Sequence, residues 1–378
     1  MQAMNDFSDV DRWQVADRDG ASLEQQAAAR RDGRDPVSGA RSLTVERQAE
    51  VVKGWGIFGW LSPELRLEPG RCYRFSCRLR STVRATWEAQ FCIGEPPAVD
   101  DLYTGALPDT GGAWLDEEHF FHGKQAKESA RIVVWPSGRG TIELACPQLR
   151  PASEEEARRS YHATLDAMPP LPPETDADAG RLLPRALERL RRGGPQPVGV
   201  MTYGDSVAFD MGNSPLETAL IEAWPGARIA FHTRGRGGTG WGRLGEPAEL
   251  AELVLSRRPQ VVITANVCTP VEEIGPTLGA VIDRVRDGCG AELVLATNAV
   301  LVNAQGDDRH ERMADAVRRL AHEKQCELAD LRAFLRGYLA AHGLPLTWHL
   351  RDAVHLSNQG KALATRFLLR HLAPGRTQ

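Results

Sequence analysis

Two kinds of hydrophobic pattern follow one another along the chain. In the first part apolar and polar residues alternate, as in "RCYRFSCRLRS", where Tyr73, Phe75, Cys77 and Leu79 share one parity. The runs "ATWEAQFCIG", "ARIVVWPSG" and "GTIELACPQL" are further short segments of this kind. Alternation places every second side chain on one face, which predicts half-buried strands. Many short strands at this spacing favour a β-sandwich or jelly roll for residues 1–150.

From residue 194 onward the apolar runs lose their strict alternation and take turns with helical patterns. The predicted strands are "PVGVMTY", "ARIAFHT", "QVVITANV", "AELVLATNAV" and a short "CELADL", and "NQGKALATRFLLRHL" is the last predicted helix. Strands that are apolar throughout and separated by helices indicate a parallel sheet covered on both faces. We therefore predict an α/β domain over residues 194–378, with its site beyond the carboxyl ends of the strands.

Residues 151–193 are predicted to connect these two domains. "SEEEARRSYHATLDAM" favours a helix with Ser153 as its N-cap and acidic residues in its first turn. "PPLPPETDADAG" is typical of a stiff polar linker, and "RLLPRALERLRRGG" of a short helix that ends at paired glycines.

Composition narrows the function classes. The chain has 378 residues, of which 42% are hydrophobic and 25% charged, as expected for a globular protein of about two domains. A formal net charge of −4 provides no basic field for nucleic acid or an anionic membrane. The seven Cys show no zinc-type spacing, so we expect no metal and no cofactor. The first residues do not resemble a signal peptide and no apolar run is long enough to span a bilayer, so we expect a cytoplasmic location; the pattern makes no prediction of oligomeric state.

Chemically useful side chains follow the predicted strands. Ser206 follows the first strand, while Asp352 and His355 lie in "RDAVHLS" near the end of the chain. A serine nucleophile needs a base to take its proton, which His355 provides, and an acid to orient that base. Asp352 lies three residues before His355 and can orient its ring from the same turn.

Donors for an oxyanion hole follow the other strands. The backbone N–H of Ser206, a glycine N–H from the loop "RGRGGTGW" and the amide of Asn266 are the predicted donors. Gly238 is the favoured glycine, with Gly237 as the alternative, because a glycine lets the backbone approach without a Cβ clash.

The same glycine loop offers a competing interpretation. Gly235, Gly237 and Gly240 fit the G-x-G-x-x-G pattern of dinucleotide sites, between a strand and a helix. In such sites the next strand ends in an acid that holds the ribose, whereas here it ends in Asn266 and Val267. The dinucleotide interpretation also leaves Ser206 and His355 without a role.

The four blocks together resemble the SGNH hydrolases, also called GDSL esterases and lipases. They are "GDS" at 204–206, "GRGGTG" at 235–240, "TAN" at 264–266 and "DAVH" at 352–355. The third block departs from the family, with Thr264 and Val267 where Gly and Asp are usual. The resemblance implies hydrolysis of an O-acyl ester through a Ser206 acyl-enzyme, with an acetylated saccharide as one candidate substrate. Two alternatives stay open: an acyltransferase that uses the same residues, and a binding or scaffold protein with a decayed site.

Tryptophans are the candidate substrate-contacting residues. Trp241 and Trp348 flank the glycine loop and the Asp352–His355 turn, and either could wall a pocket or pack against the sheet. The first part of the chain resembles the galactose-binding-like carbohydrate-binding modules, which stack sugars on aromatic rings. In that part Trp55 and Trp60, in a glycine-rich stretch, are the candidates for the far wall of the pocket.

Overall fold

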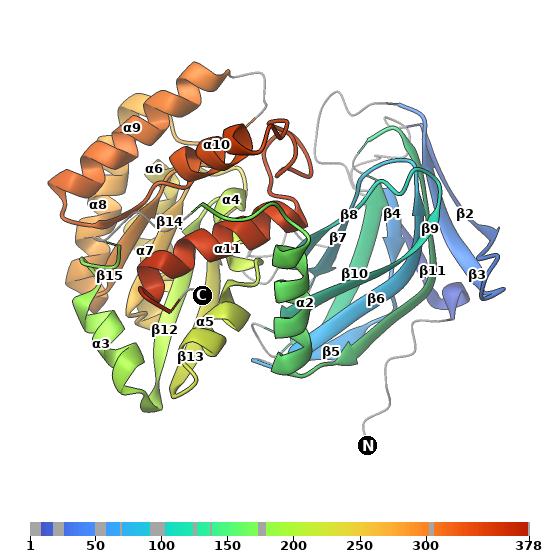
Figure 1. Cartoon of the computed structure of the whole chain (residues 1–378), viewed down its shortest axis with the longest axis horizontal. Coiled ribbons are helices and arrows are strands. Elements are labelled where there is room, and N and C mark those ends of the chain that lie inside the picture. Colours follow the sequence, from blue (N-terminus) through green and yellow to red (C-terminus); the bar gives the residue numbers. More distant parts are fainter. Residues whose placement is uncertain are drawn as a thin grey trace. The chain divides into compact units, whose positions relative to one another are not determined.

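The chain divides near Ala157 into two units with separate cores. Figure 1 shows the computed structural model of the chain. The structure describes residues 9–17, 26–49, 58–68, 70–90, 103–123, 127–136, 138–172, 179–301 and 306–376.

The first unit consists of two antiparallel sheets. One sheet has the order β1 (Gln14–Asp17), β4 (Phe58–Leu61), β10 (Lys127–Pro136), β7 (Ala85–Gln90) and β8 (Tyr103–Leu107), and β5 (Leu65–Leu67) also pairs with β10. The other has the order β2 (Ala27–Arg34), β3 (Arg41–Arg47), β11 (Gly140–Pro151), β6 (Cys72–Ser81) and β9 (Trp114–His122). A short 3-10 turn, η1 (Val10–Arg12), precedes β1.

The core of this unit lies between the inner faces of the two sheets. Tyr73, Phe75, Cys77 and Leu79 of β6 are all buried, as their alternation predicts, and they share one cluster with Ile132 of β10. Burial of every second residue is what a sheet with one covered face requires. The strands are therefore confirmed, while the jelly-roll topology and the likeness to carbohydrate-binding modules stay predictions.

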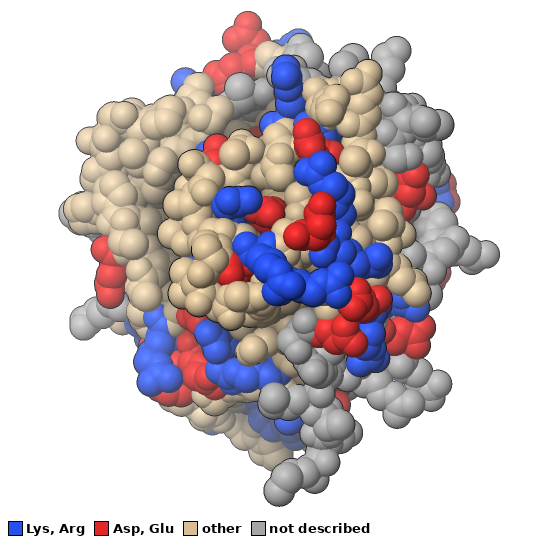
Figure 2. All heavy atoms as spheres, turned by 90° about the vertical axis from the view of Figure 1, so that its right-hand side faces the viewer, with Lys and Arg blue, Asp and Glu red and all other residues tan. Residues whose placement is uncertain are grey.

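Charges of both signs are interspersed on the face of the molecule that carries β2 and β3 (Figure 2). On these strands Arg30 pairs with Glu46 at 3.2 Å, and Arg41 pairs with Asp11 at 2.7 Å. Such pairs are largely exposed and contribute little stability. In these two pairs an acid lies beside the arginine, which reduces the positive charge that Arg30 and Arg41 present to a partner.

The second unit is built on a five-stranded parallel sheet. Its order is β13 (Ala227–Gly235), β12 (Gly194–Gly204), β14 (Val261–Ala265), β15 (Glu292–Ala296) and β16 (Glu327–Ala329). Figure 1 shows helices on both sides of this sheet. The prediction of an α/β domain with a parallel sheet is thus confirmed.

The helices among the described residues are α2 (Glu154–Asp166), α3 (Pro184–Arg192), α4 (Ser206–Gly212), α5 (Leu216–Ala223), α6 (Trp241–Leu244), α7 (Pro247–Leu253), the 3-10 turn η2 (Leu255–Arg257), α8 (Val271–Cys289), α9 (Asp307–Glu323), α10 (Leu331–Ala341) and α11 (Asn358–Leu372). The helices from α3 onward contribute to the two cores on the faces of this sheet. On β12, Val200 belongs to the core under α3, α5, α10 and α11, and its neighbour Met201 to the core under α6 to α9. Among the described residues, no helix has both the length and the apolar character needed to cross a bilayer.

Residues 151–193, which connect β11 to β12 in the sequence, form helices α2 and α3 where the residue pattern predicts them. Ser153 caps α2: its Oγ accepts from the Glu156 N–H at 3.2 Å, and Glu156 accepts from the Ser153 N–H at 2.9 Å. This reciprocal pair is a capping box, which satisfies two backbone donors at the helix start. The contacts group residues 158–193 with the second unit.

Candidate active site

Ser206, His355 and Asp352 form one chain of hydrogen bonds at the carboxyl edge of the parallel sheet. Ser206 is the first residue of α4, directly after β12, and the other two lie between α10 and α11. His355 Nε2 lies 2.9 Å from Ser206 Oγ, and His355 Nδ1 lies 2.8 Å from Asp352 Oδ2. Folding therefore brings together three predicted side chains, two of which are 149 positions apart in the sequence.

Asp352 is held in place by backbone donors as well as by the imidazole. Its Oδ1 accepts from the N–H groups of Val354 and His355, both at 2.7 Å, and Oδ2 faces His355 Nδ1. Burial raises the pKa of Asp352, but the hydrogen bond and charge of His355 and the charge of Arg351 outweigh burial and lower that pKa. An ionised Asp352 requires the Nδ1–H tautomer of His355, in which Nε2 is the atom that accepts the Ser206 proton.

Gly204 and Asp205 shape the turn that presents Ser206. A Cβ on Gly204 would lie 1.8 Å from the carbonyl oxygen of Ala265, so no other residue fits between β12 and β14. Asp205 is fully buried and accepts from the N–H groups of Val207 at 3.1 Å and Val267 at 2.9 Å. These contacts join the start of α4 to the loop after β14, which gives Asp205 a structural role.

Hydrogen bonds at both the oxygen and the nitrogen of its side-chain amide fix the orientation of Asn266. Its Oδ1 accepts from the Cys268 N–H at 3.0 Å and the Thr269 N–H at 2.9 Å, while Nδ2 donates to the Thr239 carbonyl at 2.7 Å. The NH₂ group therefore points toward the glycine loop, and the role of Asn266 as an oxyanion donor stays a prediction. Gly238 lies in that loop, exposed and with φ of +65°. The choice of Gly238 or Gly237 as donor stays a prediction.

The geometry of the glycine loop does not favour a dinucleotide. The helix that follows it, α6, has four residues, too few for the dipole that stabilises a bound pyrophosphate. Arg236 of this loop pairs with Glu249 at 2.7 Å, which lowers the positive charge available to a phosphate.

Two of the four tryptophans are buried, which contradicts the prediction for Trp60 and leaves Trp241 with the second of its two predicted roles, packing against the sheet. Trp241 is 2% exposed and packs beside Tyr203, with ring centroids 5.9 Å apart. Trp60 is also 2% exposed, lies in the core of the first unit and donates its indole N–H to the Thr44 carbonyl at 3.1 Å. Neither ring can stack on a substrate, because each is covered by its own core.

The other two tryptophans stay untested as substrate contacts. Trp348 is half-buried and lies near Tyr338, with ring centroids 6.0 Å apart, so a contact with substrate stays a prediction. Trp55 lies outside the described residues.

A buried ion cluster that the sequence interpretation missed supports the base. Asp210 lies one turn after Ser206 in α4, and its carboxylate is 2.7 Å from the Arg351 guanidinium and 3.7 Å from Lys361 Nζ. The same carboxylate accepts from the Leu356 N–H at 2.7 Å. Arg351 and Leu356 flank the segment that carries Asp352 and His355. The cluster thus ties the helix of the nucleophile to the segment of its base.

The charges of this cluster stabilise one another. All three side chains are less than 9% exposed. Burial raises the pKa of Asp210, but the charges of Arg351 and Lys361 outweigh that effect and lower it, so Asp210 stays ionised. The sequence contains one signal for this cluster, which is the single acid in the apolar run "VAFDMG". A buried carboxylate is rarely left unpaired, so Asp210 could have been predicted to have a basic partner.

Replacing Asp210 with Asn is expected to reduce both stability and turnover. The change removes the carboxylate nearest to the buried Arg351 guanidinium, and loss of one partner of a buried ion pair typically costs about 3–5 kcal/mol. At a temperature where the variant is folded, we expect a lower kcat for an ester substrate and a nearly unchanged KM, because the base shifts relative to Ser206. Thermal unfolding and steady-state kinetics measure the two effects.

Glu292→Gln is the matched control. Glu292 is a buried carboxylate of the same unit that accepts from the backbone N–H groups of Arg185 at 3.1 Å and Ala186 at 2.8 Å, at the opposite edge of the sheet. The Glu292→Gln replacement should lower the unfolding temperature and leave kcat unchanged. Equal kcat losses in the two variants would contradict a positioning role for Asp210.

Comparison with known proteins finds structural neighbours only. No family model and no curated protein matches the chain. A GDSL-like lipase from Parabacteroides merdae is 13% identical with a TM-score of 0.40, over 47% of this chain and 96% of that one. An acetylxylan esterase from Geobacillus stearothermophilus is 17% identical with a TM-score of 0.41, over 50% of this chain and 99% of that one. The chemistry of the site therefore rests on the geometry given above.

Proposed function

We propose that this protein is a serine ester hydrolase of the SGNH type. The observation that carries the proposal is the hydrogen-bonded chain from Ser206 Oγ to His355 Nε2, at 2.9 Å, and from His355 Nδ1 to Asp352 Oδ2, at 2.8 Å. A hydroxyl, an imidazole and a carboxylate in this order form the arrangement that activates a serine toward an acyl carbon.

In the proposed reaction His355 acts first as a base and then as an acid. Ser206 Oγ attacks the ester carbonyl carbon while Nε2 takes the hydroxyl proton. The tetrahedral intermediate collapses, the Nε2 proton passes to the leaving alcohol, and the acyl group stays on Ser206. Water then attacks the acyl-enzyme, again with His355 as base, and releases the carboxylic acid and free Ser206.

Three donors are proposed to stabilise the oxyanion. Ser206 begins α4, where backbone N–H groups have no acceptor within the helix. Asn266 directs its NH₂ group toward the glycine loop, and one of its two N–H bonds donates to Thr239. We assign its other N–H, the Ser206 N–H and the Gly238 N–H to the oxyanion, where donors in fixed positions are most effective.

The proposed substrates are O-acyl esters, with an acetyl group on a saccharide as the first to test. Trp60 is buried in the first unit and does not support sugar stacking. Trp348 is the described tryptophan that we propose to contact substrate.

Labelling with a fluorophosphonate ester tests the proposal directly. Serine Oγ attacks the phosphorus of the probe and displaces fluoride, which leaves a phosphonylated serine. This reaction requires a base that removes the hydroxyl proton and donors that stabilise the charged oxygen on phosphorus. We expect labelling of the wild-type protein at Ser206, identified by peptide mass spectrometry, and no labelling after Ser206→Ala. An unlabelled, folded wild-type protein would instead favour a scaffold with a decayed site.

A further inference from the structure

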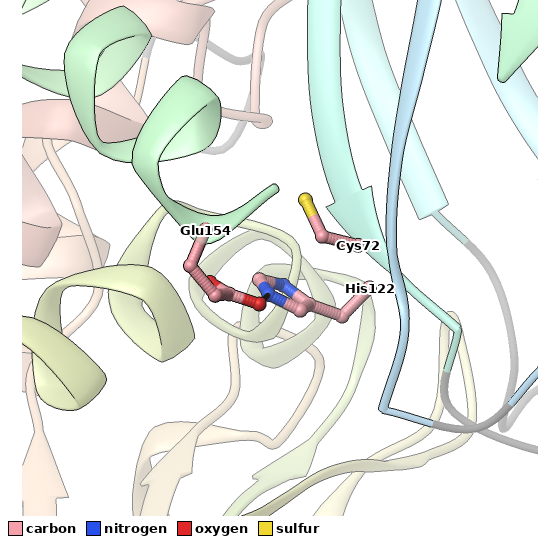
Figure 3. Close-up of side chains that lie close together, drawn as sticks. All are labelled: Cys72, His122 and Glu154. Atoms are coloured by element: carbon pink, nitrogen blue, oxygen red, sulfur yellow. Dashed lines mark hydrogen bonds and ion pairs between the residues drawn. The ribbon is translucent and has the colours of Figure 1, made fainter. Parts of the chain in front are cut away.

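Three side chains of the types that ligate metal ions converge in the first unit. Cys72 begins β6, His122 ends β9 and Glu154 begins α2 (Figure 3). The Cys72 Sγ, a ring nitrogen of His122 and a carboxylate oxygen of Glu154 all lie within 4.8 Å of one another. The three residues are 50 and 32 positions apart, so no spacing in the sequence identifies them.

The register of the sheet explains why the first two meet. Cys72 and His122 are directly opposite on the antiparallel strands β6 and β9. Tyr73 and Phe121, the next pair, face the core, so Cys72 and His122 face outward. Both are nevertheless buried, at 3% and 5% exposure. The segment before α2 runs beside them, and the Ala152 N–H donates to the Cys72 carbonyl at 2.9 Å.

The carboxylate of Glu154 is only partly satisfied. Its Oε1 lies 2.8 Å from His122 Nε2. Its Oε2 is shielded from solvent and accepts no hydrogen bond from the described residues. A buried carboxylate oxygen without a donor is costly, and proteins rarely retain one. A cation beside Oε2 would remove that cost.

We propose that Cys72, His122 and Glu154 bind a zinc-class divalent cation. Thiolate and imidazole ligands favour Zn²⁺ over Ca²⁺ or Mg²⁺, which prefer oxygen ligands only. An ion at about 2.0–2.3 Å from each ligand separates the ligands by about 3–4 Å, which small side-chain rotations within this cluster achieve. Water takes the fourth tetrahedral position, on the side where Glu154 is exposed; 41% of its side chain is accessible.

The bound ion fixes the first turn of α2 to the edge of the β6–β9 pair. The ion then links residues from two strands and a helix. Because the unfolded chain binds the ion more weakly, ion binding stabilises the folded state. Binding releases the thiol proton of Cys72, so affinity rises with pH.

The test uses the full-length protein, treated with a chelator and then titrated with Zn²⁺ or Co²⁺. We expect about one ion per chain, a higher unfolding temperature with Zn²⁺, and a thiolate-to-cobalt charge-transfer band in the near ultraviolet. Cys72→Ser should abolish the band, and Glu154→Gln should weaken Zn²⁺ binding by more than about tenfold.

Two matched variants separate the proposed site from its surroundings. Cys289→Ser removes a half-buried thiol of the second unit, and Glu155→Gln removes an exposed charge from the same helical turn as Glu154. Both should bind Zn²⁺ as the wild type does. The proposal is overturned if the wild type binds no Zn²⁺ or Co²⁺, if Ca²⁺ competes equally, or if Glu154→Gln and Glu155→Gln lose equal affinity. A hydrogen-bonded cluster without a metal function would give the first of these results.

Discussion

Replacing Ser206 with Ala is expected to lower kcat for a short-chain aryl ester by about 10⁴-fold or more. Ser206 Oγ is the atom that lies 2.9 Å from His355 Nε2, and its removal leaves no nucleophile for the acyl carbon. His355→Ala should reduce kcat to a similar extent, because the Ser206 hydroxyl then has no base. The two changes disable one unit, so the double variant should be no slower than either single variant.

Ser256→Ala provides the control for these kinetics. Ser256 lies in η2, is exposed, and donates to the Glu252 carbonyl four residues earlier at 2.6 Å. Its replacement should leave kcat and KM unchanged. Circular dichroism and the unfolding temperature verify that each variant is folded. Full activity in a folded Ser206→Ala protein would refute Ser206 as the nucleophile.

Asp352→Asn is expected to lower kcat by about 10⁴-fold while leaving the fold intact. The Oδ1 of residue 352 accepts two backbone N–H groups, and an Asn side chain keeps both bonds only when its NH₂ group faces His355. That NH₂ group must donate to Nδ1, so the ring proton moves to Nε2. A protonated Nε2 cannot accept the proton of Ser206, and the base is lost without any change of shape.

Asp352→Ala separates this tautomer effect from the support of the turn. Alanine removes the two backbone acceptors as well as the orienting carboxylate, so it should lower both kcat and the unfolding temperature. Asp352→Asn should lower kcat with little change in unfolding temperature. If Asp352→Asn retains wild-type kcat, Asp352 caps the turn and does not control the imidazole.

The order of apolar and polar residues predicted two kinds of strand: strands buried on one face and strands buried on both faces. The alternation in β6 and the apolar runs of β12, β14 and β15 correspond to described strands, because a side chain's face follows from its position in the strand. The residues at the strand ends were also identifiable, since parallel strands bring their carboxyl ends to one edge. Ser206 could therefore be chosen from its place after β12, whereas Asp352 and His355, between α10 and α11, were chosen because they lie three residues apart and complete the chemistry of Ser206.

Tertiary structure decided what depends on partners far apart in the chain. Trp60 and Trp241 lie beside glycines in the sequence, but their burial depends on the sheet and helices that cover them. Asp210 is an isolated acid until Arg351, 141 positions later, is placed 2.7 Å from it.

The convergence of Cys72, His122 and Glu154 likewise arises from strand register and the path of the chain into α2. Periodicity is set by backbone geometry within one element, whereas these contacts are set by how elements pack, which no local pattern contains.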